Sequence, residues 1–323
     1  MTRYPCIIPS VPTDYERTKI HFNRFFEMLP VSELIFVGPE SLENKIKDDL
    51  SAGLYNDNLL SFICENDLIP FSNVQKTYAS LIAKSDSTLP PSSVNWYYQQ
   101  FLKMAYSQVC ETDYYICWDS DTLPLKKTKM ISDNGKPYFD TKPENNSSYF
   151  QTIEKLLGRS KIIKNSFISE HMIFNKKLMS ELINLINDTS FVGDYFYDKI
   201  FSAIGPNNLS LGFSEFETYG TFVGLYHPTA YMLRDWKSFR NLSFFINISD
   251  ITEDDMQWLA RDYDAATFEK YQETEPMLTE LFKNKRYREK LSPKQFYTTI
   301  LESGAMGEYS NGCIKVNNNY YPV

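Results

Sequence analysis

Short apolar runs that alternate with helix-forming stretches constrain the fold of this chain more than any other feature. Four runs have the length of a strand, and the segments between the first of them have the composition of helices. The runs are Cys6–Ile8, Leu34–Val37, Leu59–Ile63 and Tyr114–Trp118, and the helical stretches are 14–29 and 41–50. Strand, helix and strand in succession build βαβ units, so the sequence predicts an α/β fold with a mostly parallel central sheet flanked by helices. Such sheets bind ligands beyond the carboxyl ends of their strands, so we expect function in the loops that follow these runs.

The character of the chain changes near residue 243, which predicts two domains. Residues 1–243 hold the alternating pattern, whereas residues 244–323 hold acidic, helical segments punctuated by Pro276 and Pro293. A chain of 323 residues fits this division, because single cores stop growing at roughly 250–300 residues. We therefore expect a catalytic α/β domain with a helical C-terminal appendage packed on it.

Charge and cysteine content narrow the possible partners and the compartment. Asp and Glu number 41 against 33 Lys and Arg, and this net charge of −8 argues against a nucleic-acid-binding protein. The five cysteines include no CxxC pair, so a reduced, cytoplasmic protein is expected. No window reaches the roughly 18 apolar residues of a membrane span, and the N-terminus has no signal-peptide pattern. At most, we expect peripheral contact with the inner face of a membrane.

The pair Asp119 and Asp121, in the sequence Trp-Asp-Ser-Asp-Thr, is the strongest chemical signal. It directly follows an apolar strand, and two carboxylates there repel each other unless a cation lies between them. Mg²⁺ and Mn²⁺ prefer oxygen ligands and substrate phosphates, so the pair predicts a site for either ion. A solvated turn with an Asx cap is the alternative interpretation.

Five segments together resemble the bacterial polysaccharide-locus glycosyltransferases of the GT-A type. They are NWYYQQFLKM (95–104), YYICWDSDTLPL (114–125), KPYFDTKPE (136–144), SFISEHMIF (166–174) and GFSEFETYGTFV (212–223). The resemblance covers about residues 6–241. It implies a nucleotide-sugar donor, most often a uridine diphosphate sugar, a divalent cation, and a hydroxyl of a glycan or lipid-linked glycan as acceptor. The resemblance also implies a role in the synthesis of a bacterial surface polysaccharide, such as capsule or lipopolysaccharide.

The resemblance assigns Asp119 and Asp121 to the metal and the donor diphosphate, and implies a later histidine as a further metal ligand. Of the three histidines, His227 best matches that position, while His21 lies in the first predicted helix and is expected at the surface. His171 is the second choice as a metal ligand. Together with Glu170 it is alternatively expected to bind the acceptor sugar. A structural imidazole is the alternative for each histidine.

The resemblance also implies a catalytic carboxylate near Glu215 and Glu217. Ser214-x-x-Glu217 has the pattern of a capping box, in which Glu217 reaches back to the backbone amide of Ser214. This leaves Glu215 as the expected base, pointing out of the first helical turn towards the cleft to accept the proton of an acceptor hydroxyl. The family more often uses Asp at this position, which leaves the choice among Glu215, Glu217 and a more distant carboxylate open.

The nucleotide is expected at the loops after the first and third strands and at a helix of about residues 94–109. The residues concerned are Pro9, Ser10 and Val11, then Glu65 and Asp67, and lastly Lys103 with Gln100, which could reach the donor phosphates. For the loops the match is by position alone, and a plain loop is as good an interpretation. For Lys103 the alternative is a solvent-facing helix stripe.

The chain contains no GxGxxG, Walker, HExxH or GxSxG motif, which excludes the common dehydrogenase, P-loop, zincin and esterase classes. A metal-dependent glycosyltransferase is the main hypothesis. The alternatives are a metal-dependent phosphodiesterase or nucleotidyltransferase that uses the same Asp pair, and an inactive sugar-binding partner of a synthase complex.

Overall fold

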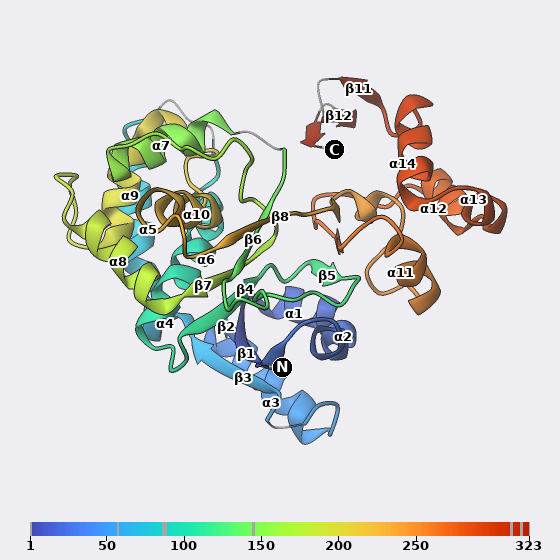
Figure 1. The fold of residues 1–323 in the computed structure, drawn as a ribbon, viewed down its shortest axis with the longest axis horizontal. Coiled ribbons are helices and arrows are strands. Elements are labelled where there is room, and N and C mark those ends of the chain that lie inside the picture. Colours follow the sequence, from blue (N-terminus) through green and yellow to red (C-terminus); the bar gives the residue numbers. More distant parts are fainter. Residues whose placement is uncertain are drawn as a thin grey trace. The chain divides into compact units, whose positions relative to one another are not determined.

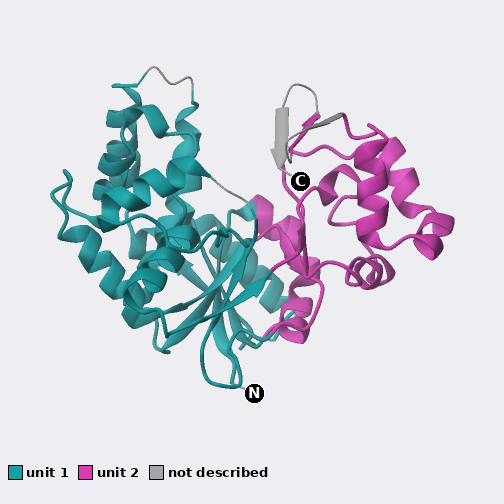
Figure 2. Cartoon of the chain, turned by 45° about the horizontal axis from the view of Figure 1, so that its top comes forward, with its two compact units in different colours: residues 1–12, 30–119, 129–235 teal, residues 13–29, 120–128, 236–323 magenta. Residues whose placement is uncertain are grey.

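The computed structural model describes residues 2–56, 58–85, 89–143, 146–310, 313–316 and 319–322. Glu144 of the third resembling segment lies outside this description. The chain forms two compact units, each assembled from separate stretches of sequence (Figure 2). The first unit comprises residues 1–12, 30–119 and 129–235, and the second comprises 13–29, 120–128 and 236–323.

A five-stranded sheet forms the centre of the first unit (Figure 1). In spatial order its strands are β3 (Leu60–Cys64), β2 (Val31–Gly38), β1 (Tyr4–Pro9), β4 (Tyr114–Trp118) and β7 (His171–Asn175). The first four run parallel to their neighbours, and β7 runs antiparallel to β4. The α/β class with a mostly parallel central sheet is therefore confirmed, with an antiparallel edge strand added.

Helices of the first unit cover this sheet and supply most of its core. They are α3 (Glu40–Ser51), α4 (Glu65–Leu68), α5 (Phe71–Ile82), α6 (Val94–Ala105), α7 (Ser147–Leu157), α8 (Lys176–Asn187), α9 (Phe196–Ile204) and α10 (Glu215–Tyr226). Helix α10 is buried on every side from Glu215 to Gly224. It can pack this closely because Gly220 lies against the ring of Phe167, where an added Cβ would come within 2.4 Å of the ring.

A two-stranded parallel ribbon also belongs to the first unit. It pairs β6 (Tyr138–Thr141) with β8 (Met232–Asp235), in the register Asp140 opposite Arg234. Directly after β6, Lys142 forms an isolated antiparallel bridge with Ser166. The ribbon and this bridge bring three distant stretches of sequence to the start of β7, where Asp140 contacts His171.

The second unit has a small sheet and a helical part. Its sheet orders β5 (Thr122–Pro124), β10 (Ala265–Thr267) and β9 (Ser238–Phe239), and its terminal ribbon comprises β11 (Glu308–Ser310), β12 (Cys313–Val316) and β13 (Asn319–Pro322). Its helices are α1 (Pro12–Thr18), α2 (Phe22–Met28), α11 (Glu253–Leu259), α12 (Pro276–Lys283), α13 (Lys285–Lys290) and α14 (Pro293–Glu302). Aromatic rings such as Phe245, Trp258 and Phe296 form its core. The predicted helical appendage therefore also contains strands.

The division into units differs from the predicted domains 1–243 and 244–323. The C-terminal part begins at Trp236, and two earlier stretches, 13–29 and 120–128, belong with it. Arg24 and the pairing of β5 with β10 link these stretches, because the Arg24 guanidinium donates to the carbonyls of Pro124 and Leu125 and pairs with Glu253. The predicted first helix is accordingly broken into α1, a short 3₁₀ turn and α2, and its histidine, His21, is buried against the carbonyl of Ile248 and not at the surface.

Among the helices that the structure describes, none combines the length and the apolar character needed to cross a bilayer.

Candidate functional site

The carboxyl ends of the parallel strands converge at one edge of the sheet, as expected. β1 and β2 approach so closely there that a Cβ on Gly38 would lie 2.2 Å from the carbonyl oxygen of Ser10, so glycine is required. Pro9 ends β1, Ser10 is buried, and Val11 is exposed. At the end of β3, Glu65 and Asp67 lie in the short helix α4. These five residues therefore occupy the strand ends where the nucleotide was predicted.

A buried lysine lies at the end of β4, between two carboxylates. The Lys103 Nζ atom on α6 lies 2.6 Å from Asp119 Oδ1 and 2.6 Å from Glu215 Oε1. The Lys103 and Glu215 side chains are 3% and 4% exposed, whereas that of Asp119 is 33% exposed. The ammonium also lies 4.4 Å from the centre of the Phe216 ring. One cation thus neutralises two carboxylates that come from different elements.

This arrangement fixes the charges of the site. Burial alone would lower the pKa of Lys103, but the two facing carboxylates raise it well above its usual value, so the ammonium stays charged. Burial raises the pKa of Glu215, although Lys103 opposes that rise. The Lys103 ammonium is enclosed between Asp119 and Glu215, and its contact with the donor phosphates stays a prediction. The prediction that Glu215 points into the cleft is wrong for this structure, because its carboxylate is buried and faces Lys103.

Helix α6 also fixes the start of α10. The side-chain oxygen of Gln100 accepts a hydrogen bond from the backbone N–H of Glu215 at 3.1 Å, and its amide donates to the carbonyl of Trp96. The hydroxyl of Ser214 accepts from the N–H of Glu217 at 3.3 Å, so Ser214 is the N-cap as predicted. Gln100 therefore serves the fold and is not turned towards a phosphate.

The other half of the predicted capping box is wrong. The Glu217 carboxylate does not return to the amide of Ser214. It pairs with Lys161 and accepts hydrogen bonds from the Ser166 hydroxyl at 2.8 Å and the Phe167 N–H at 2.7 Å. Glu217 is fully buried, so it joins α10 to the segment before β7 and is not placed to act as a base.

Glu170 and His171 are also engaged within the protein. The Glu170 carboxylate pairs with Lys142. His171 Nε2 lies 2.8 Å from Asp140 Oδ2 and Nδ1 lies 2.8 Å from the carbonyl oxygen of Ser169. Both residues are buried, with 4% and 1% exposure. The prediction that they bind the acceptor sugar is therefore wrong for this structure, because neither His171 nitrogen is available to a sugar hydroxyl.

His227 lies away from the site. It ends α10, twelve residues after Glu215, and a helix of that length measures roughly 18 Å. Its Nε2 atom lies 3.0 Å from the carboxylate of Glu181. The prediction of His227 as a metal ligand beside Asp119 is therefore wrong. Within the described ranges no group of three or more His, Cys, Asp and Glu side chains is arranged to hold a metal ion.

Asp121 belongs to the second unit, where its carbonyl accepts from the N–H of Phe268 at 2.8 Å. It is half-buried, as is Asp119. Chain geometry keeps the two Cα atoms within roughly 7 Å, because each peptide step spans about 3.8 Å. In the described part of the chain, Asp119 Oδ1 is bonded to Lys103 while Oδ2 has no hydrogen-bond partner. Mg²⁺ usually takes several of its ligands from water and phosphate, so two carboxylates would suffice, and the metal site stays a prediction.

Sequence reasoning missed four charged residues that complete this region, Asp140, Lys142, Lys161 and Arg234. Asp140 and Lys142 lie in the third resembling segment, which was a usable signal. Lys161 and Arg234 follow no pattern in the sequence. The guanidinium of Arg234 donates to both carboxylate oxygens of Asp140, at 2.5 and 2.6 Å.

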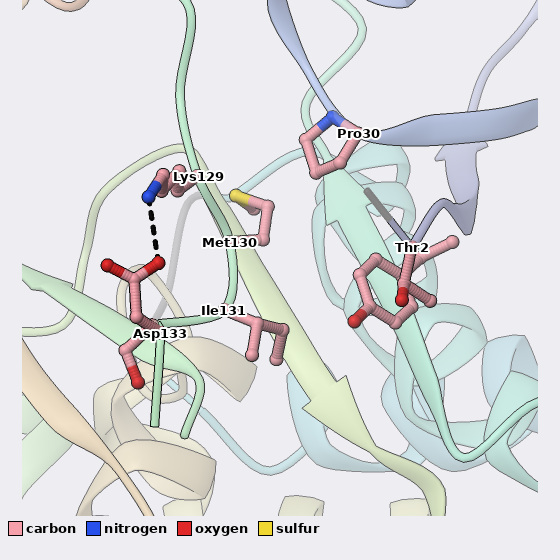
Figure 3. A pocket seen from close by; sticks show the side chains of 8 residues that line it. Thr2, Pro30, Lys129, Met130, Ile131 and Asp133 are labelled. Atoms are coloured by element: carbon pink, nitrogen blue, oxygen red, sulfur yellow. Dashed lines mark hydrogen bonds and ion pairs between the residues drawn. The ribbon is translucent and has the colours of Figure 1, made fainter. Parts of the chain in front are cut away.

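The pockets of the first unit include two that bear on the site. One of about 380 Å³ is lined by Arg234 and by residues near the other three of these charged residues or near Arg234 in the sequence, namely Thr141, Ile163, Lys164, Asn165, Leu233 and Asp235. The other, of about 190 Å³, is lined by Thr2, Tyr4, Pro30 and residues 129–133, and holds the ion pair of Lys129 with Asp133 (Figure 3). The smaller pocket lies at the amino end of β1, opposite the carboxyl ends, so we do not assign the site to it.

The chain matches a family model and is distantly similar to several solved structures. The model, described as a family of unknown function (DUF6492), matches residues 10–285. No curated protein matches the sequence. Mouse xyloside xylosyltransferase 1, in its apo form, is similar at 13% identity and a TM-score of 0.42, over 83% of this chain and 97% of that one.

Two further solved structures are similar. The galactosyltransferase LgtC, in complex with donor and acceptor sugar analogs, has 12% identity and a TM-score of 0.38, over 89% of this chain and 100% of that one. A 4-diphosphocytidyl-2C-methyl-D-erythritol synthase from Anaerococcus prevotii has 10% identity and a TM-score of 0.32, over 72% and 86%. TM-scores this low carry no argument about activity, which has to rest on the site.

Proposed function

The chain belongs to DUF6492, a family of unknown function, and we propose from its site that it is a glycosyltransferase acting on a nucleotide-diphosphate sugar. The observation that carries the proposal is the buried Lys103 between Asp119 and Glu215, at the carboxyl end of β4 in a mostly parallel sheet. Carboxyl ends of such sheets are where nucleotides bind. The resemblance of five sequence segments to polysaccharide glycosyltransferases supports the same reaction class, with a bacterial surface polysaccharide as product.

For the donor, we propose that the nucleoside lies along the ends of β1 and β3. Pro9, Ser10 and Val11 offer backbone groups and an exposed side chain, and Glu65 and Asp67 offer carboxylates to ribose or base. Burial raises the pKa of Glu65. Uridine is the proposed base, on the resemblance alone.

The donor diphosphate is proposed to lie beside Asp119 and Asp121, with Mn²⁺ or Mg²⁺ held by these two carboxylates. When bound there, a divalent cation stabilises the negative charge that develops on the departing nucleoside diphosphate. Lys103 holds the Asp119 carboxylate at one oxygen and leaves the other oxygen free for this role. Glu215 holds Lys103 in turn, so the pair sets the position and charge of Asp119 before the donor arrives.

For the acceptor, we propose the pocket of about 380 Å³, in place of Glu170 and His171. Its volume is in the range of small-molecule sites. Lys164, Asn165 and Asp235 offer donors and acceptors for sugar hydroxyls with no large excess of charge. Filling the pocket by Asn165→Trp should block transfer to a glycan while leaving slow hydrolysis of the donor, whereas unchanged transfer would refute this placement.

Product analysis tests the proposed function. The protein is incubated with a panel of nucleotide sugars and Mn²⁺, and the nucleotide released by slow hydrolysis is identified. A nucleoside diphosphate with free sugar supports glycosyl transfer, because the bond broken is that between the sugar C1 and the phosphate oxygen. A nucleoside monophosphate with sugar phosphate would establish a phosphodiesterase instead, and exchange of pyrophosphate into a nucleoside triphosphate would establish a nucleotidyltransferase.

Binding provides the second arm of this test. A ligand that binds only the folded protein raises its melting temperature. Uridine diphosphate should therefore stabilise the protein with Mn²⁺ present and much less without it. Stabilisation without any turnover across the panel would favour the inactive sugar-binding partner.

A further inference from the structure

The backbone of Glu170 is strained, and it faces Asp119. Its φ of 62° is the only positive φ among the non-glycine residues of the described ranges. Side-chain-bearing residues avoid this left-handed conformation, and such outliers gather at functional sites. The carbonyl oxygen of Glu170 accepts a hydrogen bond from the Asp119 N–H at 2.9 Å. The strained residue therefore binds the backbone of the residue that the proposed function places on the diphosphate.

Two buried ionic contacts hold this strained turn from either side. The Glu170 carboxylate pairs with Lys142, and both side chains are almost fully buried. The next residue, His171, faces the carbonyl oxygen of Ser169 with one ring nitrogen and the Asp140 carboxylate with the other. These two contacts hold the ring from both sides. Arg234 then clamps Asp140 through two hydrogen bonds.

The same turn also contacts the strand that ends at Asp119 through a ring. Trp118 pairs with His171 across β4 and β7, and the two rings stack with centres 4.5 Å apart and planes 26° apart. Both rings are fully buried. Trp118 immediately precedes Asp119. His171 therefore fixes Trp118 through ring stacking, while the carbonyl of Glu170 fixes the backbone amide of Asp119.

Stability alone does not explain so many buried charges. Removing two paired charges from water costs about as much free energy as their attraction provides. A buried ion pair is therefore weak evidence for stability, and fixing one geometry is the better explanation for it here. Here the ionic contacts of Lys142 and Asp140 converge on a turn of two residues, Glu170 and His171. The same two residues contact Trp118 and Asp119.

We infer that Glu170 and His171 are positioning residues that fix Asp119 for the donor, Glu170 through its carbonyl and His171 through Trp118, with Asp140 and Arg234 holding His171. The inference rests on the proposed function, since it assigns a purpose to the position of Asp119. It replaces direct contact with the acceptor as the role of these two residues. Outer residues that orient a ligand to a metal typically change metal affinity by about 10–100-fold when removed.

Binding of uridine diphosphate with Mn²⁺ tests the inference by calorimetry, without any need for turnover. Arg234→Met removes the clamp on Asp140 from a side chain that is 27% exposed, so the protein should still fold. Its Kd should rise by about 10–100-fold. Arg234→Lys keeps the charge but cannot make two parallel hydrogen bonds, so its Kd should be intermediate. Arg159→Met, at an exposed arginine of the same unit, is the matched control and should bind as the wild type does.

A second pair of variants tests the ring directly. His171→Gln should weaken binding, whereas His227→Gln, at the far end of α10, should not. Melting temperatures are measured in parallel, because a merely structural role would lower them and leave the Kd of folded protein unchanged. If His171→Gln does not fold, the Arg234 series decides.

The outcomes separate the inference from the proposed function. Wild-type binding that Asp119→Asn abolishes and the Arg234→Met variant weakens supports both. Wild-type binding that Asp119→Asn abolishes, with Arg234→Met and Arg234→Lys unchanged from wild type, overturns the inference alone. If neither uridine, guanosine, cytidine nor adenosine diphosphate binds the wild type with Mn²⁺, the proposed function fails, and the inference that rests on it fails too.

Discussion

Replacing Glu217 by alanine should destabilise the first unit far more than the loss of a helix cap would. The carboxylate is fully buried and pairs with Lys161, whose side chain is only 7% exposed. It also accepts hydrogen bonds from Ser166, Phe167 and, at 3.3 Å, the hydroxyl of Thr221. Alanine at this position would leave a buried ammonium and a buried backbone N–H without their partner.

The magnitude follows from those groups. Removing one partner of a buried ion pair costs about 3–5 kcal/mol, because the other charge stays buried and uncompensated. An unpaired buried N–H costs about 1–3 kcal/mol, which overlaps with the first figure and does not simply add to it. A domain of 150–250 residues loses roughly 2–4 °C per kcal/mol, so the melting temperature should fall by roughly 6–20 °C.

Urea unfolding, followed by near-UV circular dichroism and calorimetry, measures this cost. Ser214→Ala is the matched control, because it removes only the cap that Ser214 provides to the N–H of Glu217. Losing a cap costs about 1 kcal/mol. A Glu217→Ala variant no less stable than Ser214→Ala would refute the assignment of Glu217 to a buried ion pair.

A double variant separates the lost charge pair from the lost volume. The Lys161 ammonium lies 5.3 Å from the centre of the Phe150 ring and 4.4 Å from that of Phe167, so methionine fits between them. Replacing a buried pair by apolar residues is often neutral or stabilising. Lys161→Met combined with Glu217→Leu should therefore recover much of the stability that Glu217→Ala loses. A double variant as unstable as the single one would show that the cost lies elsewhere.

Three further predictions concern the metal, the buried glutamate and acid. Asp119→Asn and Asp121→Asn should each abolish turnover with the fold intact, and EDTA should do so reversibly; full activity in excess EDTA would exclude the cation. Glu215→Gln should raise the Kd for the donor, because Glu215 holds Lys103 in place beside Asp119; an unchanged Kd with transfer lowered by roughly 10²–10⁴-fold would instead identify Glu215 as the base. Burial would raise the pKa of Asp140, but hydrogen bonds from Arg234 and His171 hold it below its usual value. Its stabilisation should therefore be complete above the pKa of an unfolded aspartate, near ~3.9, and be lost as the pH falls below it, a loss that Asp140→Asn should abolish in urea midpoints measured against pH.

The four parallel strands of the sheet could be predicted from the sequence because each is a short apolar run that polar or turn residues bound, whereas the antiparallel strand β7 was not predicted. The predicted run Tyr114–Trp118 is β4 with the same bounds, and Leu59–Ile63 differs from β3 by one residue at each end. The division into units could not be predicted in this way. It depends on contacts between distant residues, such as those of Arg24, whose partners lie about 100 and 229 residues along the chain.

Some residues of the candidate site could likewise be placed from the sequence, and others could not. Asp119 could be predicted, because a carboxylate directly after a buried strand has a position that the sheet fixes. His227 was misplaced because a sequence match gives its order along the chain and not its distance from Asp119, which the length of α10 makes large. Glu170 and His171 were expected to bind the acceptor sugar, because Asp140 and Arg234, which hold His171, lie in a ribbon whose pairing has no local signal.

The burial of Lys103 has a cause that can be read from α10. On α6 alone, Lys103 and Gln100 lie beside an apolar stripe and have the spacing of a solvent-facing row. Helix α10, however, is apolar or small on every side, and a helix of that kind is expected to be buried. Its two glutamates, Glu215 and Glu217, are its only charged residues, and each then requires a cation inside the protein. Lys103 pairs with Glu215, and Lys161 pairs with Glu217. The charges of one buried helix therefore determine which lysines of the neighbouring segments are buried.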